Sequence, residues 1–502
     1  MTKLESDIII IAGGMSGICA AAAAAERGAS VTVFEKTSTV GGAANMGMGF
    51  FAVESHIQKA SLIGLTVDEA FMRFMNFNHW KAPAALVHKL YAQSGSTVKW
   101  IEDMGVEWLG AFKYFDDSEA TWHVPKVPGS NKPVPRCASI IVKAIYDYCT
   151  AQGVQFVFNT TVKKIEYNGT RVTGVYAVGA DGTEYEAESD AVIVCTGGFG
   201  DNPEMIEQYM GYRHGDDLFS FRIPGLKGEG MKMAWDIGAG KTPMVMEMTY
   251  ETPARFGGAA IDMMMRQPNL VVNLLGRRFF NEDMMSITPF AGNAIAQQKN
   301  RVGYSIISSD VIEFYRAHGV DCNSYHKHIN SISEWDDAVQ KYLDGGQVAE
   351  ANPLMGVTRE EKFFFVADSV EDLAAQLGVD PAELRRTVDR YNEFCDTGRD
   401  LDFGKKSRFL HKLTGEKFYA CKYYPSGYGS LGGIKTDENL RVIREDFTPI
   451  PGLFSAGTDC CTIFGDTYMF YFPGSTMGFA VNSGRLAGYN AVEFIDTYEF
   501  ED

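Results

Sequence analysis

The amino-acid sequence predicts an α/β fold of two domains, in which a first domain built on a largely parallel sheet is interrupted by an inserted α+β domain. Three observations lead to this expectation. Short apolar runs followed by glycines occur near residues 8, 191 and 451, as expected of strands buried on both faces. Between residues 216 and 419 the pattern changes to mixed helices and loops. The chain has 502 residues, more than one hydrophobic core ordinarily supports.

The first 36 residues are expected to form a βαβ unit. The apolar run Ile8–Ile11 suits a strand that is buried on both faces of a sheet. Six successive alanines at 20–25 give a helix slim enough to lie close on that sheet, and a second strand ends at Glu35. The expected elements are a strand over 7–12, a glycine turn over 13–17, a helix over 18–27 and a strand over 31–35.

Later segments are expected to extend this sheet or to form a smaller one. Segments 155–158, 162–167 and 172–178 alternate apolar and polar residues, with Asn168–Gly169 between two of them. We therefore expect a small antiparallel sheet there. Segment 191–198 is expected to be another buried strand that ends in glycines, as a second cofactor-binding turn would.

The central region contains an expected helix that begins near Asp380–Pro381. Strand and glycine character returns at 451–457, and a helix over 483–494 closes the first domain. The predicted organisation is a discontinuous first domain over 1–215 and 420–502, with an inserted domain over 216–419.

Charge and cysteine content exclude several classes of function. The net charge is −18, from 64 acidic and 46 basic residues, so nucleic acid is not an expected partner. No uncharged apolar stretch of membrane-spanning length occurs, and we expect a cytoplasmic protein. The nine cysteines form no C-x-x-C pair, so no iron–sulfur or haem site is expected. His326 and His328 lie near Cys322 without further zinc-spaced ligands, so no metal site is predicted.

The turn after the first strand resembles a dinucleotide-binding fingerprint. In the pattern G-x-G-x-x-G the glycines permit a tight turn, a close approach to a pyrophosphate and close packing of the helix on the strand. The three positions here are Ala12, Gly14 and Gly17, so a methyl group stands at the first. Glu35 lies 18 residues after Gly17, where a carboxylate can accept hydrogen bonds from a ribose. This indicates a Rossmann-like nucleotide-binding domain.

A second glycine turn favours FAD over NAD as the nucleotide. Lys36 follows the acidic residue, and Gly41–Gly42 can then carry the pyrophosphate toward a flavin. Further sequence blocks, spread over nearly the whole chain, are those found in known flavoproteins. They are Val40–Gly42, Cys195–Phe199, Gly228–Gly230, Met233–Ala234, Gly238–Ala239, Val272–Asn273, Gly276–Glu282, Arg390–Asn392, Asp402–Lys405, Phe418–Ala420, Gly432–Gly433, Ile450–Gly457 and Gly484–Gly488.

Through these blocks the chain resembles the flavoprotein family of soluble fumarate reductases, urocanate reductases and 3-ketosteroid dehydrogenases. The resemblance implies an FAD-binding domain with an inserted cap that holds substrate against the flavin. It also implies non-covalent FAD, because members that attach FAD use a histidine absent here from Ala43–Gly49. The expected cofactor contacts are Ala12, Gly13, Gly14, Met15, Ser16, Gly17, Glu35, Lys36, Gly41, Gly42, Ala43, Val162, Thr196, Gly197, Gly457, Thr458, Asp459, Thr476 and Met477.

The sequence departs from the fumarate and urocanate reductases where they bind and protonate a carboxylate substrate. In those enzymes an arginine four residues after the Asn–Glu pair is the proton donor, but Ser286 stands at this position. The segments Gly427–Leu431 and Phe470–Gly474 also lack the histidine and arginine that clamp the carboxylate. We therefore expect a neutral, apolar, cyclic substrate such as a steroid enone, bound against aromatic residues. These are Tyr428, Tyr468, Phe470, Tyr471 and Phe472, although Phe470 and Phe472 could equally belong to an ordinary core.

The segment after Tyr471 looks more like the ketosteroid dehydrogenases, in which a tyrosine and a glycine N–H polarise a carbonyl. This resemblance implies catalytic roles for Gly474 and for Tyr471 or Tyr468, with Tyr471 preferred. The expected reaction is hydride transfer from flavin N5 to a C=C bond, with proton transfer by the tyrosine, in either direction. Glu229 and the pair Arg278 and Glu282 are expected to position cap and substrate, with a surface salt bridge as the alternative for that pair.

Two other functions remain open. One is a reductase of phenolic or isoflavonoid compounds, including reductive loss of a hydroxyl, which some relatives in this flavoprotein group perform. The other is a flavin electron carrier that passes electrons to a protein partner. Because only one complete dinucleotide unit is visible, NAD(P)H or a flavin carrier is the expected external electron donor or acceptor.

Overall fold

The computed structural model describes residues 1–219, 223–253, 259–322, 332–346, 348–349 and 361–499. The chain forms two compact units, which we call unit 1 and unit 2. Unit 1 comprises Met1–Met205, Gly225–Met246 and Gly429–Asp502, and unit 2 comprises Ile206–Pro224 and Glu247–Tyr428. Both contain helices and sheet, so the predicted α/β class is confirmed.

The segment 225–246 differs from the predicted domain division, which assigned it to the inserted domain. In the structure it belongs to unit 1. Lys36 Nζ donates hydrogen bonds to the Gly225 carbonyl at 2.5 Å and to the Glu229 carboxylate at 2.6 Å. These contacts explain why the segment packs with the first domain, although it is separated from it along the chain.

Unit 1 is built on a six-stranded sheet in the order β19-β20-β11-β2-β3-β7. All neighbouring strands are parallel except the edge pair of β19 and β20. The central strands consist entirely of buried residues, which is why they read as unbroken apolar runs. The strands are β19 (Arg441–Ile443), β20 (Pro449–Ser455), β11 (Ala191–Val194), β2 (Ile8–Ile11), β3 (Val31–Phe34) and β7 (Gln155–Val157).

The prediction for segment 155–158 was wrong in its choice of sheet. Instead of joining the small antiparallel sheet, β7 pairs in parallel with β3 at the edge of the main sheet. It directly follows helix α5 (Ser139–Ala151), and a helix is the usual connection that brings a strand back in parallel. Its alternating pattern reflects its edge position.

The small sheet itself has the order β1-β10-β9-β8, with β1 (Thr2–Glu5), β10 (Glu184–Glu188), β9 (Val172–Gly179) and β8 (Thr160–Tyr167).

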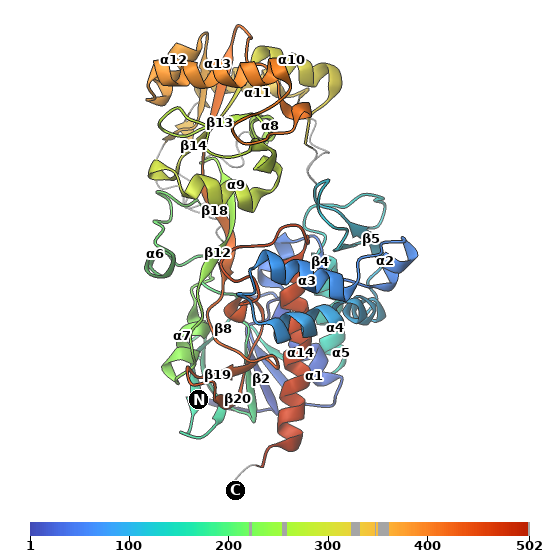
Figure 1. Ribbon diagram of the computed structural model, residues 1–502. Helices are drawn as coiled ribbons and strands as arrows, with labels where there is room; N and C mark the ends of the chain where they lie inside the picture. The colour runs from blue at the N-terminus through green and yellow to red at the C-terminus, as the bar shows by residue number, and fades with distance from the viewer. Residues whose placement is uncertain (220–222, 254–258, 323–331, 347, 350–360, 500–502) are drawn as a thin grey trace. The chain divides into compact units, whose positions relative to one another are not determined.

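Helices α1 (Met15–Ala25) and α14 (Ser475–Thr497) lie side by side in unit 1 (Figure 1). The predicted alanines of α1 are buried, and α14 presents glycines to them. A Cβ added at Gly484 would overlap the Ser16 carbonyl oxygen, and one added at Gly488 would overlap that of Ala20. The helices therefore approach closely enough to fix the start of α1, where the glycine turn lies.

The remaining elements of unit 1 are short or lie outside the main sheet. A three-stranded antiparallel sheet has the order β4-β6-β5, with β4 (Phe50–Phe51), β6 (Trp122–Pro125) and β5 (Trp108–Phe112). The other helices are α2 (His56–Ala60), α3 (Val67–Phe77), α4 (Ala84–Asp103) and α7 (Glu229–Asp236), while α6 (Pro203–Met210) begins in unit 1 and ends in unit 2. None of the helices in the described ranges is both long and apolar enough to cross a membrane.

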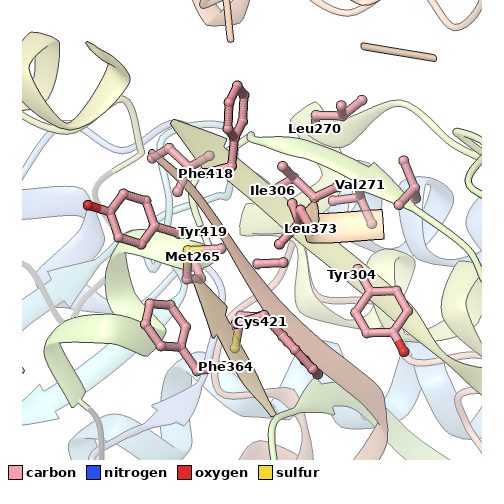
Figure 2. Close-up of a cluster of buried hydrophobic side chains, with 14 of the residues drawn as sticks. Met265, Leu270, Val271, Tyr304, Ile306, Phe364, Leu373, Phe418, Tyr419 and Cys421 are labelled. Atoms are coloured by element: carbon pink, nitrogen blue, oxygen red, sulfur yellow. The ribbon is translucent and has the colours of Figure 1, made fainter. Parts of the chain in front are cut away.

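Unit 2 has its own hydrophobic core around an antiparallel sheet (Figure 2). The labelled side chains include Leu270 and Val271 of β13, Tyr304 and Ile306 of β14, and Leu373 of α12 (Val370–Leu377). The sheet has the order β12-β18-β14-β13, and β17 also pairs with β18. The strands are β12 (Val245–Glu251), β18 (Phe418–Leu431), β14 (Gly303–Ser308), β13 (Leu270–Val272) and β17 (Phe364–Ala367).

The helices of unit 2 include the one predicted to begin at Asp380–Pro381. Asp380 caps α13 by accepting a hydrogen bond from Ala382 N at 2.9 Å, which confirms the predicted helix start. The helices are α8 (Ala259–Met265), α9 (Thr288–Ala296), α10 (Ser309–His318), α11 (Trp335–Lys341), α12 (Val370–Leu377) and α13 (Pro381–Thr397). A two-stranded ladder pairs β15 (Val348–Ala349) with β16 (Glu361–Lys362).

His123, on β6, is a fully buried titratable residue of unit 1. Its Nδ1 lies 3.0 Å from the Thr121 carbonyl and its Nε2 lies 2.7 Å from Ser55 Oγ. A carbonyl only accepts, so the neutral ring donates from Nδ1 and accepts at Nε2. Burial lowers the pKa of His123 to about 4.

We expect acid to destabilise unit 1 through His123. Its folded-state pKa lies below the ordinary value of about 6.5, so its contribution to stability is complete above pH 6.5 and is lost as the pH falls toward 4. Between pH 7.5 and pH 5 the loss is about 2 kcal/mol. Thermal unfolding midpoints across this range should fall less steeply for His123→Gln than for the wild type. Equal slopes would contradict this role of the buried imidazole.

Candidate active site

The first glycine turn follows β2 and leads into α1. Ala12 has φ 82°, a left-handed conformation that glycine adopts more readily. The methyl group at the first fingerprint position is therefore accommodated without changing the turn, although it leaves backbone strain. A Cβ added at Gly17 would overlap the Ala12 carbonyl oxygen, so this position requires glycine.

The first turn is tied to the end of β3 and to the second glycine turn. Gly13 N donates to the Glu35 carboxylate at 2.8 Å, and Gly41 N donates to the Gly13 carbonyl at 2.8 Å. The other Glu35 oxygen accepts from the Thr37 amide and hydroxyl. The Glu35 side chain thus holds the two turns in register, in addition to its expected contact with a ribose.

The start of α1 fits an anionic group. Gly14 directly precedes the helix. A Cβ added at Gly14 would have the Cys195 carbonyl oxygen as its nearest neighbour, at 3.8 Å, so there is open space beside this glycine. Gly42 also leaves room, since an added Cβ would lie 3.6 Å from Gly14 Cα. The first N–H groups of a helix have no intrahelical acceptor and bind phosphates. The predicted residues Met15 and Ser16 lie in this first turn of α1.

The turn after β11 is joined to the C-terminal part of unit 1 through Asp459. Its fully buried carboxylate accepts hydrogen bonds from the amide and hydroxyl of Thr196, from Gly197 N at 3.2 Å and from Gly198 N at 2.8 Å. Burial raises the pKa of Asp459, and these donors oppose that rise. Asp459 therefore positions the second predicted cofactor turn.

The segment after β20 meets the same edge of the sheet. A Cβ added at Gly457 would overlap Ser16 Oγ, and Gly457 N donates to Ser483 Oγ at 2.9 Å. Three glycine-containing turns, after β2, β11 and β20, therefore gather at the carboxyl ends of adjacent parallel strands, where α/β sheets bind ligands. This cradle fits a dinucleotide such as FAD.

The other predicted cofactor residues lie in unit 1, and their contacts with FAD stay predictions. Ala43 is exposed in the turn Gly42–Met46, and Val162 is buried in β8. Thr458 follows Gly457, while Thr476 and Met477 lie in the first turn of α14.

The predicted aromatic segment packs against the loop between β5 and β6. Phe470 stacks on Phe115, with ring centroids 5.8 Å apart, and meets Tyr114 edge-on at 5.0 Å. Phe472 is fully buried, whereas Phe470 and Tyr471 are partly exposed. Of the two phenylalanines that could have belonged to an ordinary core, Phe472 is therefore a core residue, whereas Phe470 is partly exposed.

The two candidate tyrosines differ in burial. Tyr468 is 3% exposed, and its hydroxyl accepts a hydrogen bond from Thr476 N at 3.3 Å. Tyr471 is partly exposed, and burial, with a smaller effect of Asp117, raises its pKa. The raised pKa keeps the Tyr471 hydroxyl protonated at neutral pH.

Gly474 caps α14 in the left-handed conformation, with φ 84°. An added Cβ would lie 2.7 Å from Phe51 N and 2.8 Å from Trp122 Cδ1, so only glycine fits. Its position at the positive end of a 23-residue helix suits stabilisation of a negatively charged oxygen.

A pocket of about 390 Å³ opens beside this segment within unit 1. Its lining residues come from α3, from the loop between β5 and β6, and from the aromatic segment. They are Arg73, Asn76, Phe77, Asp117, Glu119, Met469, Tyr471 and Phe472.

The sequence analysis missed the contributions of Tyr114, Phe115, Asp117 and Glu119 to this region. The available signal was the run of two aromatic residues followed by acidic residues over 114–119, in the loop between β5 and β6.

The predicted substrate residues in unit 2 are Arg278, Glu282 and Tyr428, and their side chains differ in burial. Arg278 binds Glu282 through two hydrogen bonds, at 2.6 and 2.8 Å, and binds Asp400 through two more, at 2.9 and 3.0 Å. Both partners of the predicted pair are buried, so the alternative of a surface salt bridge was wrong. Tyr428 lies on β18 and is partly exposed. The substrate roles of these residues, and of Glu229 in unit 1, stay predictions.

No group of three or more side chains of the metal-ligating types was found within the residues that the structure describes. His326 and His328, which were considered in the sequence analysis, lie outside those residues.

We expect Gly17→Ala to lose FAD, because its methyl group would overlap the Ala12 carbonyl oxygen and displace the first turn. Flavin absorbance after gel filtration should fall at least about tenfold relative to protein, because overpacking of about 1–3 kcal/mol acts directly on the binding turn. The matched control is Ala12→Gly, which relieves the positive φ and should retain FAD. Full flavin content in Gly17→Ala would show that this turn does not form the binding site.

Comparison with known proteins agrees with this cradle. The model of the FAD binding domain family matches residues 7–469. Vinyl phenol reductase of Lactiplantibacillus plantarum is 28% identical over 503 residues, covering 97% of this chain and 96% of that protein. Urocanate reductase of Eggerthella lenta is 27% identical over 505 residues, covering 97% of this chain and 74% of that protein.

A solved structure has the same fold. The 3-ketosteroid Δ1-dehydrogenase of Sterolibacterium denitrificans, in complex with 1,4-androstadiene-3,17-dione, matches with a TM-score of 0.73 at 19% identity, covering 98% of this chain and 100% of that one. The resemblance inferred from the sequence, the cofactor FAD and the class of FAD-dependent oxidoreductase are thereby confirmed. The chain belongs to the FAD binding domain family.

Proposed function

We propose that this flavoprotein reduces, or in the reverse direction forms, a C=C bond conjugated to a neutral ring. The observation that carries the proposal is the partly exposed aromatic surface of Phe470 and Tyr471, next to a pocket whose arginine is already paired. Arg73 binds Glu119 and Glu69, each at 2.5 Å. Such a surface favours a flat, uncharged ring over a dicarboxylate, which needs unpaired cations.

Bound FAD would supply or accept the hydride in this reaction. The residues of the chain would orient the ring and handle the proton. Phe470 and Tyr471 would form one side of the ring site, with Tyr114 and Phe115 packed against Phe470. Tyr428, Phe472, Glu229 and the Arg278–Glu282 pair remain proposed contributors to this site or to the placement of its cap.

Tyr471 is our proposed proton donor, and Tyr468 is the second candidate. Burial raises the Tyr471 pKa, which keeps its hydroxyl protonated and able to donate at neutral pH. Its partial exposure leaves it accessible to a substrate, whereas Tyr468 is almost completely enclosed. The Gly474 N–H, at the positive end of α14, would stabilise negative charge on a substrate oxygen.

The relatives favour one class of substrate. A reductase named for vinyl phenol aligns over nearly the full length of both chains, which supports the phenolic alternative from the sequence analysis. We therefore rank a phenolic compound with a conjugated C=C bond first and a steroid enone second. Within the phenolic class, the proposal includes reductive loss of a hydroxyl.

The proposal also covers the attachment of FAD, the location of the protein and the external electron donor or acceptor. Other reductases among the relatives favour a small-molecule substrate over an electron carrier that serves a protein partner. We propose non-covalent FAD, a cytoplasmic location and reoxidation or reduction by NAD(P)H or a flavin carrier. One dinucleotide unit is formed by the residues that the structure describes, so we propose that the external donor binds transiently.

We expect Tyr471→Phe to slow substrate reduction by about 10²- to 10⁴-fold, the usual contribution of a positioned acid. The enzyme is reduced chemically without oxygen, and flavin reoxidation is followed after addition of 4-vinylphenol, an isoflavone or a steroid enone. Tyr468→Phe is the matched comparison, and its rate should stay within a few-fold of the wild type. A loss confined to Tyr468→Phe would assign the proton to Tyr468, and reoxidation by none of these compounds would sink the proposed function.

A further inference from the structure

We propose that Asp459 controls how fast FAD enters the cradle, because its carboxylate keeps the turn after β11 in its binding shape before FAD arrives. This turn consists of Thr196, Gly197 and Gly198, and we call it the β11 turn. Asp459 is then a positioning residue that acts through the β11 turn. The inference concerns the cofactor alone and does not depend on which substrate the flavin reduces.

The β11 turn is flexible by composition. Gly197 and Gly198 both have a left-handed backbone, with φ values of 89° and 81°. A Cβ added at Gly198 would lie 2.3 Å from Ser430 Oγ, so the position is suited to glycine. Two adjacent glycines lose much conformational freedom when their backbone is fixed. The β11 turn therefore needs an anchor if it is to keep one shape.

The Asp459 carboxylate provides such an anchor for three successive backbone N–H groups. Thr196 N and Gly197 N donate to Oδ2, the latter at 3.2 Å, and Gly198 N donates to Oδ1 at 2.8 Å. The Thr196 hydroxyl lies 3.0 and 2.9 Å from the two oxygens. Successive N–H groups that converge in this way form an anion-binding nest. A carboxylate of the chain itself fills this nest, so the shape of the turn does not depend on a ligand.

Burial makes these hydrogen bonds strong and their loss costly. Asp459 is completely buried, and Gly198 is buried with it. Hydrogen bonds to an ionised oxygen are stronger than those between neutral groups. Without the carboxylate, the N–H groups of the β11 turn would lose their acceptor in the protein interior, which is unfavourable. The turn is therefore held mainly by this one side chain.

Asp459 is itself fixed by the sheet. Strand β20 lies beside β11 in parallel, with Ser455 opposite Val194, so both strands deliver their following segments to the same edge. The Asp459 carbonyl accepts a hydrogen bond from Ile434 N at 2.8 Å. The anchor thus depends on contacts within unit 1 and not on the cofactor.

The same anchor reaches the start of α7. The Thr196 hydroxyl, which donates to Asp459, accepts a hydrogen bond from Gly230 N at 3.2 Å in the first turn of this helix. A binding site that is formed only part of the time captures its ligand correspondingly less often. A preformed β11 turn therefore allows FAD to bind without waiting for the turn to fold.

The first test measures the shape of the turn without FAD. FAD is removed from the full-length wild type, and hydrogen exchange is followed by mass spectrometry in peptides that cover 191–194 and 195–199. The β11 strand, 191–194, is the internal reference for an intact sheet. We expect exchange in 195–199 to be equally slow, within about threefold, with and without FAD, because its amides stay bound to Asp459. Rapid exchange of 195–199 beside a protected strand would overturn the inference.

The second test measures the rate of FAD binding, from the quenching of flavin fluorescence, in wild type, Asp459→Asn and Asp310→Asn. Asp310 is the matched control in unit 2, because its carboxylate also accepts from two amides and two hydroxyls. The donors are Val311 N at 3.1 Å, Thr414 N at 3.1 Å, Thr414 Oγ1 at 2.6 Å and Ser308 Oγ. Thermal unfolding midpoints of both variants report any general loss of stability.

We expect Asp459→Asn to slow FAD association at least about tenfold, since the amide presents a donor to the N–H groups and loses at least one charge-assisted hydrogen bond. Asp310→Asn should stay within about twofold of the wild type. Unchanged association in Asp459→Asn, even with faster FAD release, or equal slowing in both variants, would overturn the inference. If Asp459→Asn does not fold, the exchange measurement on the wild type decides.

Discussion

The close approach of three glycines to the start of α1 is the constraint on which the cofactor cradle depends. Gly17 lies against the Ala12 carbonyl, and Gly457 lies against Ser16, with no room for a side chain at either. Gly484 allows α14 to approach the start of α1 from the other side. A single methyl group at any of these positions would shift the start of α1, where the phosphates of a dinucleotide are expected. The alanines of α1 serve the same requirement along the rest of the helix.

Much of this cradle could be predicted from the sequence, because its signals are local. The apolar run before Gly13, the alanine helix and Glu35 at the end of the next strand all occur within 36 residues. Segment 155–158 was assigned to the wrong sheet because its alternation fits any half-exposed strand, while its partner is chosen by the preceding helix. Segment 225–246 was misplaced because the contact between Lys36 and Glu229 joins positions nearly 200 residues apart.

The pocket beside Tyr471 was harder to predict for the same reason. Arg73, Asp117 and Tyr471 come from three separate segments, and no periodic pattern connects them. The hydrogen bond from the Glu119 amide to the Tyr471 carbonyl joins two of these segments, and such a long-range contact leaves no local signal in the sequence. The aromatic segment itself was predicted, but whether each ring belongs to the core depends on packing. Phe472 is buried against Phe51 and Tyr91, which a single sequence cannot reveal.

Two arginines of unit 2 are held by carboxylates of the same unit. In unit 2, Arg278 is 4% exposed and is fully engaged by Glu282 and Asp400. Arg266 is likewise bound to Glu251 and Asp262. Releasing either guanidinium to clamp a substrate carboxylate would leave buried carboxylates unpaired, at a cost of several kcal/mol. These arginines therefore stabilise unit 2 itself.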